Sequence, residues 1–249
     1  MSDCREISWA DLFDFVIIGH QRSGSTFLCR LLSSNPGVVC LEEIFNPSHL
    51  HDTVTVTERR VEIRTTSEPS RLAARDTDPA AYVDRLRDQC DGKALGFKLF
   101  REHCAYAIDA VKESKIPRLI LKRNYLDSFT SWQVARASGR WHNYGETVGV
   151  PSDGTLEFNL DGFTRWCDSN DRFYKALTRP GDLVIWYRDG FDAATLGSIA
   201  DHLQVPNDFS AELVGIKPST DRSIAKRYRD FGAVIEKLRG SRFEELLPR

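Results

Sequence analysis

The chain has 249 residues, 41% of them hydrophobic and 28% charged, and a formal net charge of −2 at pH 7. This length suits one α/β domain or two small ones. The near-neutral charge gives no reason to expect a nucleic-acid partner, and no apolar run approaches the length of a membrane span. The first residues lack the pattern of a signal peptide. Six cysteines without any Cys-x-x-Cys spacing favour a reducing cytoplasm.

Five short apolar runs are predicted to be β-strands, and a helical pattern precedes or follows each of them. The runs are Phe15–Ile18, Val38–Leu41, Ala94–Lys98, Arg118–Lys122 and Leu183–Tyr187. Strands that alternate with helices imply right-handed crossovers and a parallel sheet with helices on both faces. We therefore predict an α/β fold with a P-loop-like parallel sheet of about five strands, in a single domain over residues 1–249. Ligands of such sheets bind beyond the carboxyl ends of the strands.

The loop after the first predicted strand is the most informative segment. Small residues lead from this strand into a helix predicted over Thr26–Ser34. The free N–H groups of such a loop and the helix dipole together attract an anion. Gly19 and Gly24 have the spacing of a nucleotide P-loop, but Ser25 occupies the position of its lysine. The cation lies upstream instead, at Arg22.

The loop resembles that of a known family. Gln21-Arg22-Ser23-Gly24-Ser25-Thr26 is similar to the 5′-phosphosulfate-binding loop of sulfotransferases that use 3′-phosphoadenosine-5′-phosphosulfate. The similarity is greatest to the bacterial carbohydrate-type branch. The resemblance implies that this co-substrate is bound by Arg22, Ser23, Gly24, Ser25 and Thr26.

A second motif follows the predicted strand Arg118–Lys122. In the family a strand ends in an arginine, a serine eight residues later opens the next helix, and the two bind the 3′-phosphate. Arg123 and Ser131 have this spacing, which implies the same role for them. A guanidinium offers a planar fork of donors to phosphate oxygens, and a serine adds a hydroxyl. Ser128 is a nearer hydroxyl, and Arg123 could instead pair with Asp127.

A glutamate after the first helix is the candidate general base. Asn35–Pro47 resembles the family segment in which a short strand delivers a glutamate ahead of Phe-Asn-Pro. This resemblance implies that Glu43 takes the proton of the attacking hydroxyl. Glu42 is the immediate rival, because neighbouring residues on an extended segment point in opposite directions. His20 and His103 are further candidates, since an unperturbed histidine titrates near neutral pH.

Lys98 lies in a Gly-Phe-Lys run that resembles a central strand of the family. We expect it near the nucleotide or the acceptor, because an unpaired buried lysine is costly. The last predicted strand ends in Tyr187-Arg188-Asp189, where the family has Tyr-Glu-Asp, so no acidic role is carried over.

These features predict a sulfotransferase that moves a sulfonate group from 3′-phosphoadenosine-5′-phosphosulfate to a hydroxyl of a carbohydrate or another small molecule. Transfer needs in-line geometry and charge stabilisation, and we expect Arg22 to neutralise the phosphate oxygens without a metal. The alternatives are a P-loop kinase or nucleotide hydrolase with a degenerate loop, and a nucleotide-binding protein without catalysis. The absent loop lysine and the lack of a strand that ends in a Walker-B-type aspartate count against the kinase.

Several parts of the chain are less informative. The stretches 49–78 and 137–155 are either lids or acceptor-recognition segments, or solvated loops. Asp161–Ala176 and Ser223–Leu238 are predicted amphipathic helices, with Phe163 and Trp166 in the core. Cys29 and Cys40 are expected to be buried. The sequence leaves the acceptor and the oligomeric state open.

Overall fold

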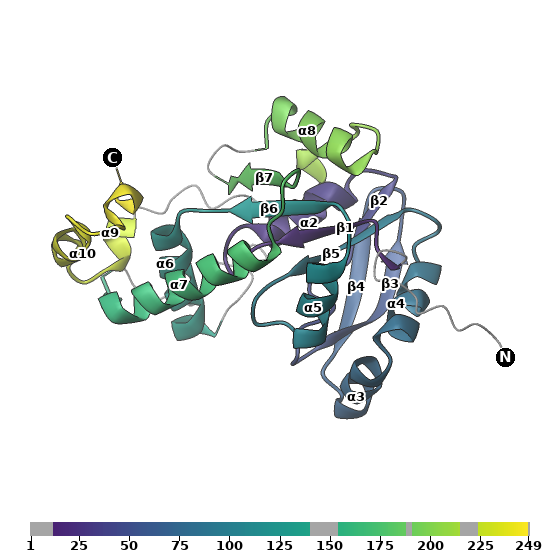
Figure 1. Cartoon of the computed structure of the whole chain (residues 1–249), viewed down its shortest axis with the longest axis horizontal. Coiled ribbons are helices and arrows are strands. Elements are labelled where there is room, and N and C mark those ends of the chain that lie inside the picture. Colours follow the sequence, from purple (N-terminus) through teal and green to yellow (C-terminus); the bar gives the residue numbers. More distant parts are fainter. Residues whose placement is uncertain (1–11, 140–153, 188–190, 215–223, 249) are drawn as a thin grey trace.

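The structure of the chain is a computed structural model that describes residues 12–139, 154–187, 191–214 and 224–248. Five strands form one sheet in the order β2-β5-β1-β6-β7, with every pairing parallel (Figure 1). The strands are β1 (Phe15–Ile18), β2 (Val38–Cys40), β5 (Ala94–Leu99), β6 (Arg118–Lys122) and β7 (Leu183–Trp186). The predicted parallel sheet is confirmed, and its strand bounds differ from the prediction by at most one residue.

Helices cover both faces of this sheet, as predicted. One face packs against α2 (Ser25–Ser33) and α8 (Ala193–Leu203), and the other against α4 (Pro79–Asp88), α5 (Ala105–Glu113) and α7 (Leu160–Leu177). A third apolar cluster joins α6 (Tyr125–Ser138) and α7 to α9 (Ile224–Arg227) and α10 (Phe231–Leu238). Phe163 and Trp166 are buried there, which confirms their prediction as core residues. The C-terminal part also contains the 3-10 helices η2 (Ala211–Val214) and η3 (Glu244–Leu246).

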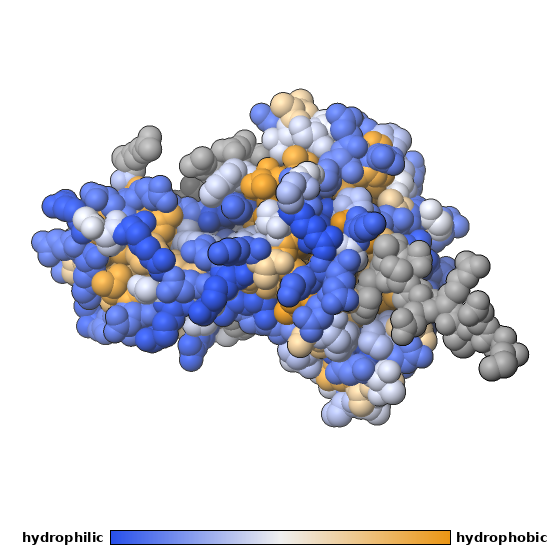
Figure 2. All heavy atoms as spheres, viewed as in Figure 1, coloured by the Kyte–Doolittle hydropathy of each residue, from blue (hydrophilic) through white to orange (hydrophobic). Residues whose placement is uncertain are grey.

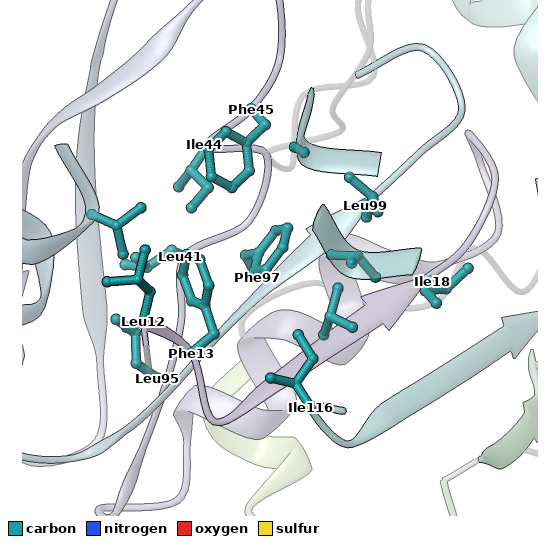
Figure 3. Packing of buried hydrophobic residues seen from close by; sticks show 14 of the residues in the cluster. Leu12, Phe13, Ile18, Leu41, Ile44, Phe45, Leu95, Phe97, Leu99 and Ile116 are labelled. Carbon is teal, nitrogen blue, oxygen red and sulfur yellow. The ribbon is translucent and has the colours of Figure 1, made fainter. Parts of the chain in front are cut away.

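The central strands alternate their side chains between the two apolar layers. Phe15 packs in the layer of α2, whereas Phe97 packs in the opposite layer, beside Phe13 and Phe45 (Figure 3). Gly96 pairs with Phe15, and a Cβ at Gly96 would lie 2.2 Å from the Phe15 ring. In the Gly-Phe-Lys run of β5, Gly96 therefore leaves space for the ring of Phe15 from β1, and Phe97 packs in the opposite layer.

The stretch 49–78 is regular secondary structure rather than a solvated loop, and its role as a lid or acceptor-recognition segment stays a prediction. It holds an antiparallel hairpin of β3 (Leu50–Val56) and β4 (Val61–Thr66), followed by α3 (Pro69–Thr77). Leu50 and Val54 are buried in the core, while most of β4 is exposed or half-buried. One-sided burial of this kind follows from period-two patterning, which the polar composition of the stretch concealed.

The helix predicted over Ser223–Leu238 is interrupted. It is two helices, α9 and α10, and Tyr228 between them forms a β-bridge with Leu156. Cys29 and Cys40 are buried, as predicted, with their sulfur atoms 3.0 Å apart. Most of the stretch 137–155 lies outside the described residues.

The visible face of the molecule is mostly hydrophilic, with small groups of hydrophobic side chains (Figure 2). The edge strand β7 exposes Val184 and Trp186. Within the described residues no helix is both long and apolar enough to cross a membrane.

Candidate functional site

The chain makes a tight turn between β1 and α2. Arg22 and Gly24 have φ values of 66° and 96°, in the left-handed region. A Cβ at Gly24 would lie 2.3 Å from ring carbons of Tyr187, so the turn requires glycine. Gly24 is also the N-cap of α2 and has no side chain to cap it. The first N–H groups of this helix therefore suit an external anion.

The second motif lies against this loop. Arg123 donates through Nη1 to the carbonyl oxygen of Arg22 at 3.1 Å, and Arg22 donates through Nε to Ser131 Oγ at 3.0 Å. The Arg123 guanidinium lies over the Tyr187 ring, 4.6 Å from its centroid. Ser128, the nearer hydroxyl, is 3.5 Å from the Arg22 carbonyl oxygen. Arg22, Arg123 and Ser131 thus share one site at the carboxyl ends of β1 and β6.

One expectation about this motif is wrong: Ser131 does not open the helix. Helix α6 begins at Tyr125, and Asn124 caps it by accepting hydrogen bonds from the N–H groups of Leu126 and Asp127. Ser131 reaches Arg22 from the second turn of α6. Asp127 forms no ion pair with Arg123 among the described residues, although Arg123 partly offsets the burial that raises the pKa of Asp127.

Lys98 connects the loop to the two candidate glutamates. Its ammonium group lies 2.9 Å from Thr26 Oγ1, 3.1 Å from Glu43 Oε1 and 3.8 Å from Glu42 Oε2. The side chain is 1% exposed, so its charge is buried but paired. Burial lowers the pKa of Lys98, but Glu43 and Glu42 raise it further, and it stays above its ordinary value.

The side chains of Glu42 and Glu43 do not point in opposite directions as expected for an extended segment. Glu42 has a φ of 53°, so the chain is not extended there and both carboxylates approach the same lysine. Glu42 also lies 3.9 Å from Arg30 Nε. Glu43 differs from Glu42 in its further partners.

Glu43 accepts a hydrogen bond from Asn46 Nδ2 at 2.9 Å, and its Oε2 lies 3.5 Å from His103 Nε2. His103 Nδ1 accepts from the N–H of Phe100 at 3.3 Å, so the imidazole proton is on Nε2 and points to Glu43. Burial raises the pKa of Glu43, but Lys98, His103 and Asn46 outweigh it and hold the pKa far below its usual range. His103 Nε2 therefore faces the Glu43 carboxylate, although the two groups form no hydrogen bond.

His20 is enclosed by the loop and the helices behind it. Tyr174 donates its hydroxyl to the Leu121 carbonyl at 2.6 Å, so His20 Nδ1–H donates to the Tyr174 oxygen at 2.8 Å. Burial, Arg123 and Arg101 lower the pKa of His20 to about 3. With 1% exposure, this neutral imidazole is poorly placed to take a proton from an acceptor.

Several buried side-chain atoms at the strand ends have no hydrogen-bond partner among the described residues. They are His20 Nε2 and Ser23 Oγ after β1, Arg101 Nε, Glu102 Oε2 and His103 Nε2 after β5, and Arg123 Nε after β6. Buried polar atoms are normally paired, so this concentration is typical of a site that binds a polar ligand. The described residues contain no cluster of three or more metal-ligating side chains.

Residues 14–183, more than half of the chain, match the sequence pattern of the sulfotransferase family. The chain belongs to that family. The sulfotransferase is therefore an enzyme of sulfonate transfer, and the family typically takes its sulfonate from 3′-phosphoadenosine-5′-phosphosulfate.

Two solved structures resemble this sulfotransferase at low identity. One is the sulfotransferase domain from the Synechococcus PCC 7002 olefin synthase, with 16% identity, a TM-score of 0.47, and coverage of 94% of this chain and 88% of that chain. The other is mouse sulfotransferase SULT7A1 complexed with PAP, with 13% identity, a TM-score of 0.44, and coverage of 95% and 75%. No curated protein matches the chain.

Three residues of this candidate site were not predicted from the sequence. Tyr187 packs against Gly24 and Arg123, Asn46 binds Glu43, and Arg101 contributes an unpartnered buried nitrogen. Asn46 belongs to the Phe-Asn-Pro run, so a signal for it was present. The contacts of Tyr187 and Arg101 depend on how neighbouring strands align.

Proposed function

We propose that the protein transfers a sulfonate group from 3′-phosphoadenosine-5′-phosphosulfate to a hydroxyl of a carbohydrate or another small molecule. The observation that carries the proposal is the contact of Lys98 with both Thr26 and Glu43. Lys98 thus connects the loop that can bind an anion to the carboxylate that can accept the proton of a hydroxyl. Membership of the sulfotransferase family supports the reaction class.

The donor would lie across the carboxyl ends of β1 and β6. In this proposal the residues Arg22, Ser23, Gly24, Ser25 and Thr26 hold the 5′-phosphosulfate, and Arg123 with Ser131 holds the 3′-phosphate. When bound, the donor supplies an activated sulfonate whose leaving group is a phosphate. The unpartnered nitrogen of Arg123 and hydroxyl of Ser23 suit these oxygens.

Arg22 would stabilise the negative charge that develops on the leaving phosphate. Its left-handed backbone presents the side chain beside Ser131, and a fixed cation stabilises charge that appears in the transition state. We propose that such cations suffice without a metal, because a sulfonate carries less charge than a terminal phosphate.

Glu43 would take the proton of the acceptor hydroxyl. Its depressed pKa keeps it ionised and also makes it a weak base. Proton transfer is therefore expected late, when the attacking oxygen has bonded to sulfur and become more acidic. Asn46 and His103 orient Oε2, and Lys98 binds Oε1.

The acceptor would be polar. Asn46 and His103 surround Glu43 with hydrogen-bonding groups, which fits a carbohydrate hydroxyl and the resemblance of the loop to the carbohydrate-type branch. The proposal includes a single domain over residues 1–249 and a cytoplasmic location.

An acceptor screen tests the proposal. The full chain is incubated with the phosphosulfate donor and panels of carbohydrates and other small alcohols, and products are followed by mass spectrometry. We expect one acceptor class to gain a single sulfonate group while 3′-phosphoadenosine-5′-phosphate accumulates. Failure to release this nucleotide with any acceptor, or with water, would contradict the proposed function.

A further inference from the structure

Arg75 is a buried cation in the stretch that the sequence left unassigned. It lies in α3, its side chain is 0% exposed, and it is among the largest fully buried side chains. A buried charge destabilises a fold unless its donors are paired. The partners of Arg75 therefore show what its burial achieves.

One nitrogen of Arg75 binds three carbonyl groups of a single turn. Nη1 lies 3.2 Å from the carbonyl oxygen of Ile44, 2.8 Å from that of Asn46 and 3.1 Å from that of His49. The turn spans residues 43–49 and joins β2 to the β3–β4 hairpin. Since these carbonyls belong to neither a helix nor a strand, the guanidinium supplies hydrogen bonds that no regular secondary structure provides, to the buried residue Ile44 and to the half-buried Asn46 and His49.

This turn carries the proposed base. Asn46, whose carbonyl binds Arg75 at 2.8 Å, donates through Nδ2 to Glu43 Oε2 at 2.9 Å. Asn46 Oδ1 accepts from the N–H of Ser48 at 2.9 Å, which fixes the orientation of the amide. Arg75 is thus connected to the Glu43 carboxylate through one residue.

Arg75 is itself held in place. Its Nε donates to Asp76 Oδ1 at 2.8 Å, and the Tyr106 hydroxyl donates to the same oxygen at 2.8 Å. On the other side of the turn, Ile44 and Phe45 point into the core (Figure 3). The turn is therefore clamped between apolar packing and one guanidinium.

We propose that Arg75 is a positioning residue for sulfonate transfer, which fixes the Glu43 carboxylate by holding the turn at residues 43–49. The proposal rests on the proposed function, because it takes Glu43 as the group that meets the acceptor. Arginine suits the task, since a rigid fork serves the carbonyls and Asp76 together, whereas lysine has a single nitrogen.

A double-mutant cycle tests the coupling without any assay of activity. Arg75→Ala and Glu43→Gln are made singly and together, and urea unfolding of the full chain is measured. We expect non-additivity, with the effect of Glu43→Gln on the unfolding midpoint reduced by about half when Arg75 is absent. Arg71→Ala is the matched control, since Arg71 lies in the same helix and pairs with Asp52 and Glu68 instead. Additive effects for Arg75 would overturn the proposal.

Arg75→Lys serves as the second variant if Arg75→Ala does not fold, because it keeps the charge and the stem of the side chain. It should show the same non-additivity with Glu43→Gln. Additive behaviour of a folded Arg75→Lys would overturn the proposal in the same way.

Cleavage of the phosphosulfate donor with water as acceptor gives a second readout. We expect Arg75→Ala to lower kcat about 10- to 100-fold with the donor KM unchanged, and guanidinium ion at low concentration to restore part of kcat. An unchanged kcat, or a loss confined to the donor KM, would overturn the proposal. A wild-type chain that cleaves no donor, either with water or with any acceptor of the screen, would contradict the proposed function instead, and the unfolding cycle would still decide the role of Arg75.

Discussion

The ammonium group of Lys98 lies 3.1 Å from the carboxylate of Glu43, at a position where the lysine side chain is 1% exposed. The same ammonium binds Thr26 at the start of α2. One buried cation therefore fixes the distance between the loop after β1 and the segment after β2, although β5 separates these two strands in the sheet.

Replacing Lys98 by methionine should destabilise the fold by about 3 kcal/mol, because it removes one partner of a largely buried ion pair. The pKa of Glu43 should rise towards its ordinary value as the charge of Lys98 disappears. Urea unfolding measures the first effect, with the exposed Lys112→Met as control. The pairing would be unimportant if both variants unfolded at the same midpoint.

Gly24→Ala should abolish nucleotide binding, because the new Cβ would meet the Tyr187 ring at 2.3 Å and the backbone φ is 96°. Gly92→Ala is the control, since Gly92 has a φ of 69° but nothing within 4 Å of the new Cβ. Adding Tyr187→Ala to Gly24→Ala should recover part of the binding in calorimetry. Wild-type affinity in Gly24→Ala would show that the loop does not hold the ligand.

Arg123→Ala should weaken the binding of 3′-phosphorylated adenosine nucleotides while leaving 3′-dephosphorylated ones almost unchanged. The 3′-phosphate is bound alike before and during transfer, so the loss should fall on affinity more than on turnover. Arg136→Ala, which removes an exposed arginine of α6, is the matched control. An unaltered preference for the 3′-phosphate in Arg123→Ala would exclude Arg123 as its ligand.

Stability should fall as pH decreases from 7 to 5. Burial is the main cause that lowers the pKa of His20 and of His51 to about 3. The charges of Arg123 and Arg101 lower the pKa of His20 further, and those of His49 and Lys98 lower that of His51. The unfolded chain then binds more protons below its ordinary histidine pKa of 6.5, at a cost of about 2 kcal/mol per histidine by pH 5. Urea unfolding of His51→Gln should show a correspondingly flatter pH dependence. An unchanged slope would contradict the neutral, buried state of His51.

The sheet could be predicted from the sequence because its five strands are short apolar runs beside helical patterns. The hairpin β3–β4 was missed because polar residues on its exposed face concealed the alternation around Val54 and Ile63. The Arg22, Arg123 and Ser131 motifs could be located, since their residues are close in sequence to strand ends. The shared contact of Glu42 and Glu43 with Lys98 could not be predicted, because it depends on the left-handed backbone conformation of Glu42.

Glu43→Gln should reduce turnover about 100- to 10,000-fold, because it removes the proposed proton acceptor while keeping the shape of the side chain. Donor affinity should stay near that of the wild type. Glu42→Gln is the matched control, since Glu42 shares Lys98 but has neither Asn46 nor His103 as a partner among the described contacts. Loss of turnover in Glu42→Gln alone would identify Glu42 rather than Glu43 as the base. Full activity in both variants would show that neither glutamate is the base.

Calorimetry with 3′-phosphoadenosine-5′-phosphate, with and without a chelator, tests most directly the claim that the loop after β1 and Arg123 form a donor site. We predict tight binding that the chelator does not change, and weaker binding of ATP, because Arg22 and Arg123 supply positive charge to the donor phosphates at the ends of β1 and β6. Binding that disappears with the chelator, or a preference for ATP with magnesium, would contradict this account.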